Sequence, residues 1–177
     1  PERVVPDRQI SAGFMHSGYP FMCWIDPSQK DSVDLPKLMK DGNWGFFHEL
    51  GHNHQCSAWT FTGQTEVTCN LFSLYVMEKL VGKPTGRGHP SMEKLDELLA
   101  KRFAAEPNMG PFEQLATFVL LIRAHGWAPL RETLRSYATE AAPKGSTKEQ
   151  LQDLFVLRYG KAAKADVSDY FTKMGYH

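Results

Sequence analysis

The sequence has little that would tie it to a membrane or to nucleic acid. Its longest apolar stretch lies within residues 115–122, far short of the roughly 20 residues that cross a bilayer. Twenty basic residues balance twenty acidic ones, so the formal net charge is zero. Without a net field, nothing draws the chain toward phosphate backbones or anionic lipid. We therefore expect no transmembrane segment and no nucleic-acid partner.

Cysteine is also scarce, because the chain has three: Cys23, Cys56 and Cys69. Three cysteines are too few for a disulfide framework, and no CxxC spacing is present for a thiolate zinc site. We interpret them as small buried hydrophobic residues. A disulfide between Cys56 and Cys69 stays open as an alternative, since both flank one loop between two predicted helices.

The start of the chain lacks the features of a natural amino terminus. Residues 1–6 contain neither an apolar signal core nor an initiating methionine. We therefore expect the chain to be part of a longer polypeptide with upstream domains. Of its 177 residues, 42% are apolar and 23% are charged, which is typical of globular proteins.

The apolar pattern predicts a short β portion followed mainly by helices. Residues 20–25 are predicted to form a buried strand closed by Asp26-Pro27. A capping box at residues 146–149 is predicted to begin one of the later helices. The predicted helices span residues 44–57, 66–80, 91–105, 112–125, 129–139, 146–159 and 166–173. The fold class is α+β, mostly α, with a first domain at 1–90 and a helical subdomain at 91–177.

The sequence His48-Glu49-Leu50-Gly51-His52 is an HExxH pattern within a predicted helix. Residues four apart lie on one helix face, so the two imidazoles can converge on one ion. Zinc accepts nitrogen ligands at about 2.0–2.1 Å in tetrahedral geometry. Glu49 is rotated away from the ligand face, and we predict that it activates a metal-bound water as general base. Gly45 and Gly51 each cost the helix about 1 kcal/mol against Ala, which indicates close approach of another backbone or of a metal site.

A catalytic zinc needs a third protein ligand, and Glu66 is the best candidate. It lies at the start of the next predicted helix, after a loop short enough to fold that helix back over the first. We therefore predict one Zn²⁺ held by His48, His52 and Glu66. Asn70 lies one turn after Glu66, where it can accept a ring N–H from a ligand histidine and fix the tautomer.

Two iron sites compete with zinc on the same residues. Two histidines and a carboxylate also suit non-haem iron oxygenases, and residues 49–52 match the ExxH of di-iron bundles. The di-iron interpretation fails because the chain has no second ExxH. The oxygenase interpretation leaves Glu49 without a role, whereas zinc hydrolysis uses every residue of the motif.

The chain resembles the M60, or enhancin-like, peptidases, a group of gluzincins. The resemblance rests on residues 44–55, Trp-Gly-Phe-Phe-His-Glu-Leu-Gly-His-Asn-His-Gln, on residues 65–71, Thr-Glu-Val-Thr-Cys-Asn-Leu, and on residues 13–20. Softer similarity continues through residues 118–127 and 169–171. The resemblance implies a zincin-like fold, with His48, His52 and Glu66 as zinc ligands and Glu49 as the catalytic carboxylate.

The resemblance also implies a substrate class and a place of action. Many bacterial members are secreted or surface proteins that cut O-glycosylated, mucin-like proteins, so we expect a zinc endopeptidase acting on a glycoprotein or peptide. The vertebrate TRP-channel-associated factors share the domain, lack a complete metal motif and act by binding a channel. Because all three ligands and Glu49 are intact here, a non-catalytic binding module of that type is the alternative.

The resemblance further suggests which residues line the substrate cleft. In gluzincins a strand near the motif helix pairs with the substrate backbone, and His125 and Tyr137 would enter the cleft from the helical subdomain. A packed Gly-Pro turn and a histidine that offsets a helix dipole are the alternatives. The predicted cleft residues are His16, Gly18, Tyr19, Pro20, His125 and Tyr137.

Overall fold

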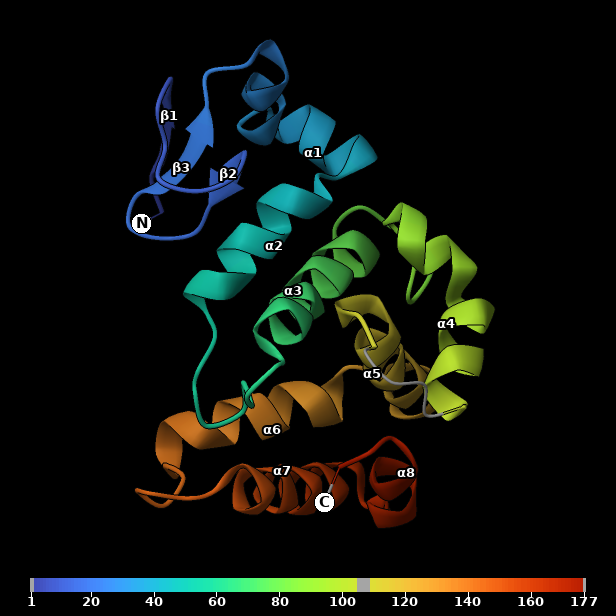
Figure 1. The fold of residues 1–177 in the computed structure, drawn as a ribbon. Helices are drawn as coiled ribbons and strands as arrows, with labels where there is room; N and C mark the ends of the chain where they lie inside the picture. Colours follow the sequence, from blue (N-terminus) through green and yellow to red (C-terminus); the bar gives the residue numbers. More distant parts are fainter. Residues whose placement is uncertain (1, 105–108, 177) are drawn as a thin grey trace. The chain divides into compact units, whose positions relative to one another are not determined.

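The computed structural model describes residues 2–104 and 109–176. Within this part of the chain it contains eight α-helices and one three-stranded sheet, which confirms the predicted α+β, mostly α fold (Figure 1). The chain forms two compact units. Unit 1 comprises Pro1–Gln55 and Glu66–Glu93, and unit 2 comprises Cys56–Thr65 and Lys94–His177. The division into domains at 1–90 and 91–177 stays a prediction.

Unit 1 begins with the sheet, which has the order β1-β3-β2. Strand β3 (Phe21–Trp24) pairs in parallel with β1 (Val4–Asp7) and antiparallel with β2 (Met15–His16). The predicted strand at 20–25 is therefore present, but it is half-buried. Phe21 and Cys23 are buried whereas Trp24 is 48% exposed, because alternate side chains of a strand point to opposite faces.

The helices of unit 1 are α1 (Leu35–Asp41), α2 (Trp44–Asn53) and α3 (Thr65–Lys79), with short 3-10 helices at Pro27–Ser32 and Pro90–Lys94. Asn43 caps α2, since its side-chain oxygen accepts the backbone N–H of Phe46. Helix α2 ends at Asn53 rather than at the predicted residue 57. The backbone N–H of His54 turns back to the carbonyl of Gly51, three residues earlier, and this tight turn ends the helix.

The apolar core of unit 1 joins the sheet to the motif helix. Phe21 and Cys23 from β3 pack with Phe46 and Phe47 from α2 and with Met77 from α3. The rings of Phe21 and Phe46 meet edge to face, with centroids 5.1 Å apart, a favoured aromatic geometry. This packing fixes the position of α2 against both the sheet and α3.

Unit 2 is helical and has an aromatic core. Helix α4 (Leu95–Phe103) packs on α5 (Pro111–His125), and α6 (Ala128–Thr139) packs on α7 (Lys148–Ala163). The capping box that begins α7 joins Thr147 to Gln150, one residue later than the predicted box at 146–149, because Thr147 has the extended backbone of a cap. The short helix α8 (Ser168–Lys173) follows α7.

Two further features bear on the sequence analysis. Among the described residues, no helix combines the length and apolar character needed to cross a membrane. All three cysteines are free thiols: Cys23 and Cys69 are buried, and Cys56 is exposed. The alternative of a disulfide between Cys56 and Cys69 is therefore not realised.

Candidate metal centre

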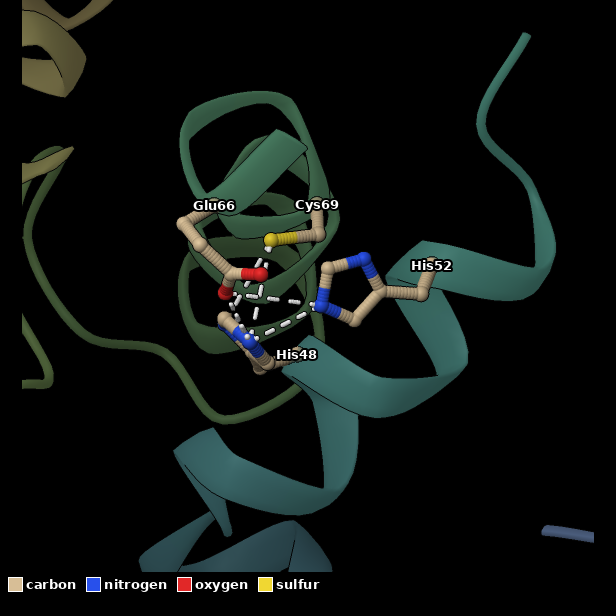
Figure 2. A group of neighbouring side chains, drawn as sticks. All are labelled: His48, His52, Glu66 and Cys69. Carbon is tan, nitrogen blue, oxygen red and sulfur yellow. Dashed lines mark hydrogen bonds and ion pairs between the residues drawn. The ribbon is translucent and has the colours of Figure 1, made fainter. Parts of the chain in front are cut away.

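Two helices bring the predicted ligands together. His48 and His52 lie one turn apart on α2, and their Nε2 atoms are 3.1 Å from each other. Glu66, in the first turn of α3, places Oε2 3.1 Å from Nε2 of His48 and 3.6 Å from Nε2 of His52. Figure 2 shows both rings and the carboxylate turned toward one another. Ligand atoms around a tetrahedral zinc are about 3.3 Å apart, given bonds of about 2.0–2.1 Å, so the three atoms have metal-site spacing.

The two helices approach each other closely at Gly51. A Cβ atom on Gly51 would collide with the backbone carbonyl of Cys69 on α3. The glycine therefore allows the backbones to meet at a place where any side chain would separate them. This close approach explains why α2 keeps a residue of poor helix propensity, and it brings Glu66 within reach of the two histidines.

The tautomer of His48 follows from its neighbours. Nδ1 of His48 lies 2.8 Å from Oδ1 of Asn70, and the same oxygen accepts the indole N–H of Trp44 at 2.8 Å. The amide nitrogen of Asn70 donates to the carbonyl of Glu66 at 2.8 Å, which fixes the orientation of the amide. Because Oδ1 can only accept, Nδ1 of His48 donates this hydrogen bond, and in the tautomer that carries its proton on Nδ1 the Nε2 atom has a lone pair.

His52 is held in the same way by a different amide. Its Nδ1 lies 2.8 Å from Oε1 of Gln55, while Nε2 of Gln55 donates to the hydroxyl of Thr68 at 2.6 Å. The donated hydrogen bond orients the Gln55 amide, so its oxygen must accept the proton on Nδ1 of His52. The Nε2 lone pair of His52 therefore also points at the cluster.

With both rings in this tautomer, three hydrogen-bond acceptors converge: Nε2 of His48, Nε2 of His52 and Oε2 of Glu66. None of these three atoms then carries a proton to donate to the others. The two Nε2 lone pairs and Oε2 of Glu66 repel one another unless a cation lies among them. A proton can bridge one pair of these atoms, whereas a divalent ion satisfies all three. The donor set of two imidazoles and one carboxylate therefore fits a metal ion.

Cys69 adds a fourth donor atom to this group. One ligand atom from each of His48, His52, Glu66 and Cys69 lies within 4.8 Å of all the others. The Cys69 side chain is fully buried, whereas the Glu66 side chain is 61% exposed. Burial, and secondarily the charge of Glu66, raises the pKa of the Cys69 thiol. The cluster therefore combines a buried thiol with a carboxylate that is largely exposed.

Glu49 lies beside the cluster and holds the segment before β3. Its Oε2 accepts the backbone N–H of Ser17 at 2.9 Å. One turn later, Asn53 accepts the N–H of Gly18 at 2.8 Å and donates to the carbonyl of Gly18 at 3.1 Å. Two residues of α2 with i, i+4 spacing therefore fasten residues 17 and 18 to the motif helix.

The predicted cleft residues in unit 1 all belong to this fastened segment. His16 ends β2, and its ring bonds to the Ser17 carbonyl and the Ser11 hydroxyl at 2.8 and 3.0 Å. Gly18 has φ +133, a backbone region that other residues rarely adopt. The Tyr19 side chain is 70% exposed, and a cis peptide bond joins it to Pro20. Their contact with a substrate stays a prediction.

The other two predicted cleft residues, His125 and Tyr137, belong to unit 2. His125 ends α5, and its ring meets the ring of Tyr159 edge to face with centroids 6.1 Å apart. Tyr137 is buried under the guanidinium of Arg158, which lies 4.2 Å from the ring centroid. Burial raises the pKa of Tyr137 to about 12. A role of either residue in catalysis stays a prediction.

Sequence reasoning missed several residues that organise the cluster. Gln55 follows His52 by three residues and Asn53 follows Glu49 by four, so helical spacing was an available signal for both. Trp44 donates its indole N–H to the Asn70 oxygen that His48 also uses, and this hydrogen bond has no counterpart in the sequence pattern. Cys69 was interpreted as a hydrophobic residue, although it follows Glu66 by three and shares its face.

Comparison with known proteins finds relatives that are several times longer. Mouse (Mus musculus) TRPM8 channel-associated factor 2 is 41% identical over 146 residues, covering 78% of this chain and 16% of the relative. Human (Homo sapiens) TRPM8 channel-associated factor 2 is 36% identical over 183 residues, covering 99% of this chain and 20% of the relative. The chain therefore spans about a fifth of the human relative.

A solved structure and a family model extend this result. A crystal structure of a functionally unknown conserved protein mutant from Bacillus anthracis str. Ames aligns with a TM-score of 0.80 and 24% identity, covering 99% of this chain and 36% of that one. This likeness shows a common fold. The family model for peptidase M60, enhancin and enhancin-like proteins matches residues 1–175. The chain therefore belongs to the peptidase M60, enhancin and enhancin-like family.

Proposed function

We propose that the chain is the catalytic part of a zinc-dependent endopeptidase, with one Zn²⁺ held by His48, His52 and Glu66. The observation that carries the proposal is the convergence of two Nε2 lone pairs on Oε2 of Glu66 at 3.1 and 3.6 Å. Hydrogen bonds to Asn70 and Gln55 fix both tautomers in the form that a metal needs. Histidines that bind metals are usually oriented by hydrogen bonds of this kind.

Glu49 is the proposed general base. When bound, the zinc ion would lower the pKa of a water molecule toward about 7 and polarise the scissile carbonyl. The Ser17 N–H holds Oε2 of Glu49, which leaves Oε1 to take the water proton. Glu49 would then pass this proton to the leaving amine.

Residues 16–20 form the proposed edge of the substrate cleft. An extended peptide can pair with a strand edge through its backbone, and β2 is an edge strand of the sheet. Asn53 holds both backbone groups of Gly18, so Gly18 is fixed before substrate arrives and the proposed backbone pairing is assigned to β2. Such preorganisation lowers the entropic cost of binding an extended chain.

The proposed substrates are O-glycosylated, mucin-like proteins, which would place the protein in a secreted or cell-surface setting. Mass spectrometry of a mucin and its deglycosylated form, each incubated with the full-length protein, tests this class. We expect cleavage of the glycosylated form that a chelator abolishes. Equal cleavage of both forms would contradict the proposed need for a glycan but would still support peptidase activity.

The decisive variant is Glu49→Gln. It keeps the shape of the side chain but removes the base, so we expect turnover to fall by at least about 100-fold. Zinc content, measured by mass spectrometry of the native protein, should be unchanged because residue 49 is not a ligand. Glu97→Gln makes the same chemical change on an exposed position of α4 and should leave turnover intact. Parental turnover in Glu49→Gln would contradict the assigned role.

A second candidate function is a protein-binding module. It is favoured by the relatives named TRPM8 channel-associated factors, and a partner such as a channel would then bind without any cleavage. Binding of this kind should survive both chelation and Glu49→Gln. Chelator-sensitive proteolysis that is lost in Glu49→Gln would favour the enzyme.

A further inference from the structure

A loop of unit 1 that supplies no proposed ligand places a histidine ring against the motif helix. Residues 86–93, the 86–93 loop, run into the short 3-10 helix at Pro90–Lys94. The ring centroid of His89 in this loop lies 5.2 Å from that of Trp44, at an interplanar angle of 55°. Trp44 precedes His48 by four residues on α2 and therefore lies on the same helix face. The loop thus contacts the helix that carries two of the proposed ligands.

Two contacts fix the 86–93 loop around His89. Gly88 has φ +112, and a Cβ atom there would lie 2.6 Å from Cε of Met77 on α3, so the glycine lets the loop lie directly on that helix. The backbone N–H of Ser91 donates to Nδ1 of His89 at 3.1 Å. The first contact fixes the backbone and the second fixes the imidazole, so the ring is presented to Trp44 in a defined orientation.

Trp44 connects this ring to the proposed zinc ligand His48. Its indole N–H donates to Oδ1 of Asn70 at 2.8 Å, and the same oxygen accepts from Nδ1 of His48 at 2.8 Å. The indole therefore helps to fix the oxygen that orients His48. Burial, and secondarily the charge of His48, lowers the pKa of His89, which shows that the two imidazoles are also within electrostatic reach of each other.

We infer that His89 is a positioning residue of the metal centre, which holds the Trp44 indole in the orientation that supports His48. The inference rests on the metal centre of the proposed function. Rotation of the indole about its side-chain torsions would carry the N–H away from Asn70, and the ring of His89 packed beside it opposes this rotation. Partners that orient a metal ligand from outside raise metal affinity without touching the ion. The 86–93 loop thereby contributes to zinc affinity.

Two substitutions of His89 in the full chain separate its contact with Trp44 from its role within the loop. His89→Phe keeps an aromatic ring beside Trp44 but loses the acceptor for the Ser91 N–H. His89→Asn loses the ring, whereas its side-chain oxygen can accept the N–H two residues on. We expect His89→Asn to weaken zinc binding by about 10-fold, the lower end of the range for losing an outer partner of a metal ligand. His89→Phe should keep the parental affinity, and competition with a chromophoric chelator measures both.

Trp44→Phe tests whether His89 acts through the indole. This substitution keeps a ring but removes the N–H that reaches Asn70, so it should weaken zinc binding by about 10-fold as well. Adding His89→Asn to Trp44→Phe should then cause little further loss, because the indole that His89 holds is already absent. Independent contributions would instead multiply to a loss of about 100-fold, which a double-mutant cycle detects.

The matched control is His54→Asn. His54 also stacks on an aromatic ring, with its centroid 5.6 Å from that of Phe72, but a phenyl ring has no N–H with which to orient a partner of the ligands. The same chemical change at this position should therefore leave zinc affinity unchanged. Circular dichroism of every variant checks that the fold is retained.

The outcomes separate this inference from the proposed function. Weakened zinc binding in His89→Asn, parental affinity in His89→Phe and a double variant no weaker than Trp44→Phe support the inference together. In a parent that binds zinc, any other order of these affinities would overturn it and leave the three-ligand centre intact. Weak binding in His89→Phe with parental affinity in His89→Asn, for example, would mean that His89 only stabilises the loop. Failure of the parent to bind Zn²⁺ would overturn both.

Discussion

The α2–α3 pair of unit 1 and the aromatic core of unit 2 are packed on opposite principles. Between α2 and α3, polar side chains face inward, and each is oriented by a partner: His48 by Asn70, and His52 by Gln55. In unit 2 the core is built from rings that meet edge to face around Phe155, which lies 6.0 Å from Phe61 and from Phe171 between ring centroids.

This difference indicates that unit 2 contributes mainly to stability, whereas the cluster between α2 and α3 is built to orient its side chains. Aromatic packing tolerates small changes in the orientation of the rings, and it stabilises the fold in proportion to the apolar area that is buried. An inward polar cluster supplies little net stability, because desolvation offsets its hydrogen bonds, but it specifies directions closely. We therefore expect substitutions in unit 2 to lower stability and substitutions between α2 and α3 to lower metal affinity.

Phe155→Ala should have the largest effect on stability. Phe155 is 1% exposed, and truncating a buried Phe typically costs about 3–5 kcal/mol. We expect the free energy of unfolding, measured by urea denaturation, to fall by this amount. Zinc affinity of the folded fraction should not change, since every residue of the cluster lies in unit 1. A large loss of zinc affinity in the folded protein would contradict the claim that the core of unit 2 affects stability but not the metal cluster.

Asn70→Ala should show the opposite pattern. The substitution removes the oxygen that accepts from both Nδ1 of His48 and the indole N–H of Trp44. We expect zinc affinity, measured by competition with a chromophoric chelator, to fall by about 10- to 100-fold. Asn53→Ala is the matched control, because it removes the same amide from the cleft edge. It should leave zinc affinity unchanged and raise KM instead. Equal zinc affinities for the two variants would contradict the role of Asn70.

Much of the centre could be predicted from the sequence, because it depends on helical spacing. His48, His52 and Glu49 follow from one turn of one helix, and the structure also brings Glu66 to the two histidines from the next helix. The hydrogen bond from His48 to Asn70 likewise reflects the single turn between Glu66 and Asn70. These relations are set by local geometry, which the chain carries in its residue order.

The other contacts of the site depend on how α2 and α3 pack against each other. The spacing of residues along the sequence carries no information about this packing. Cys69 shares a face with Glu66, but its approach to His48 depends on the distance between α2 and α3. The hydrogen bond from Ser17 to Glu49 joins residues 32 positions apart, and only the packing of β2 on α2 creates it. The end of α2 at Asn53 was also missed, because the turn at His54 satisfies the last carbonyls with bonds that the apolar pattern does not show.

The two glycines of α2 provide the finest test of the comparison, since only one of them lies at the helix crossing. A Cβ on Gly51 would collide with the carbonyl of Cys69, whereas a Cβ on Gly45 would meet Met15 at an ordinary 3.5 Å. Ala raises helix propensity by up to about 1 kcal/mol at either position. Overpacking against a backbone that cannot rotate away typically costs about 1–3 kcal/mol.

Gly51→Ala should therefore lower the free energy of unfolding by up to about 2 kcal/mol, the overpacking cost less the full gain in helix propensity. It should also weaken zinc binding, because separating α2 from α3 moves Glu66 away from His48 and His52. Gly45→Ala should be neutral or slightly stabilising and should keep full zinc affinity. Thermal denaturation and zinc titration of both variants measure these effects. Indistinguishable behaviour would mean that contact between the two backbones does not set the geometry of the cluster.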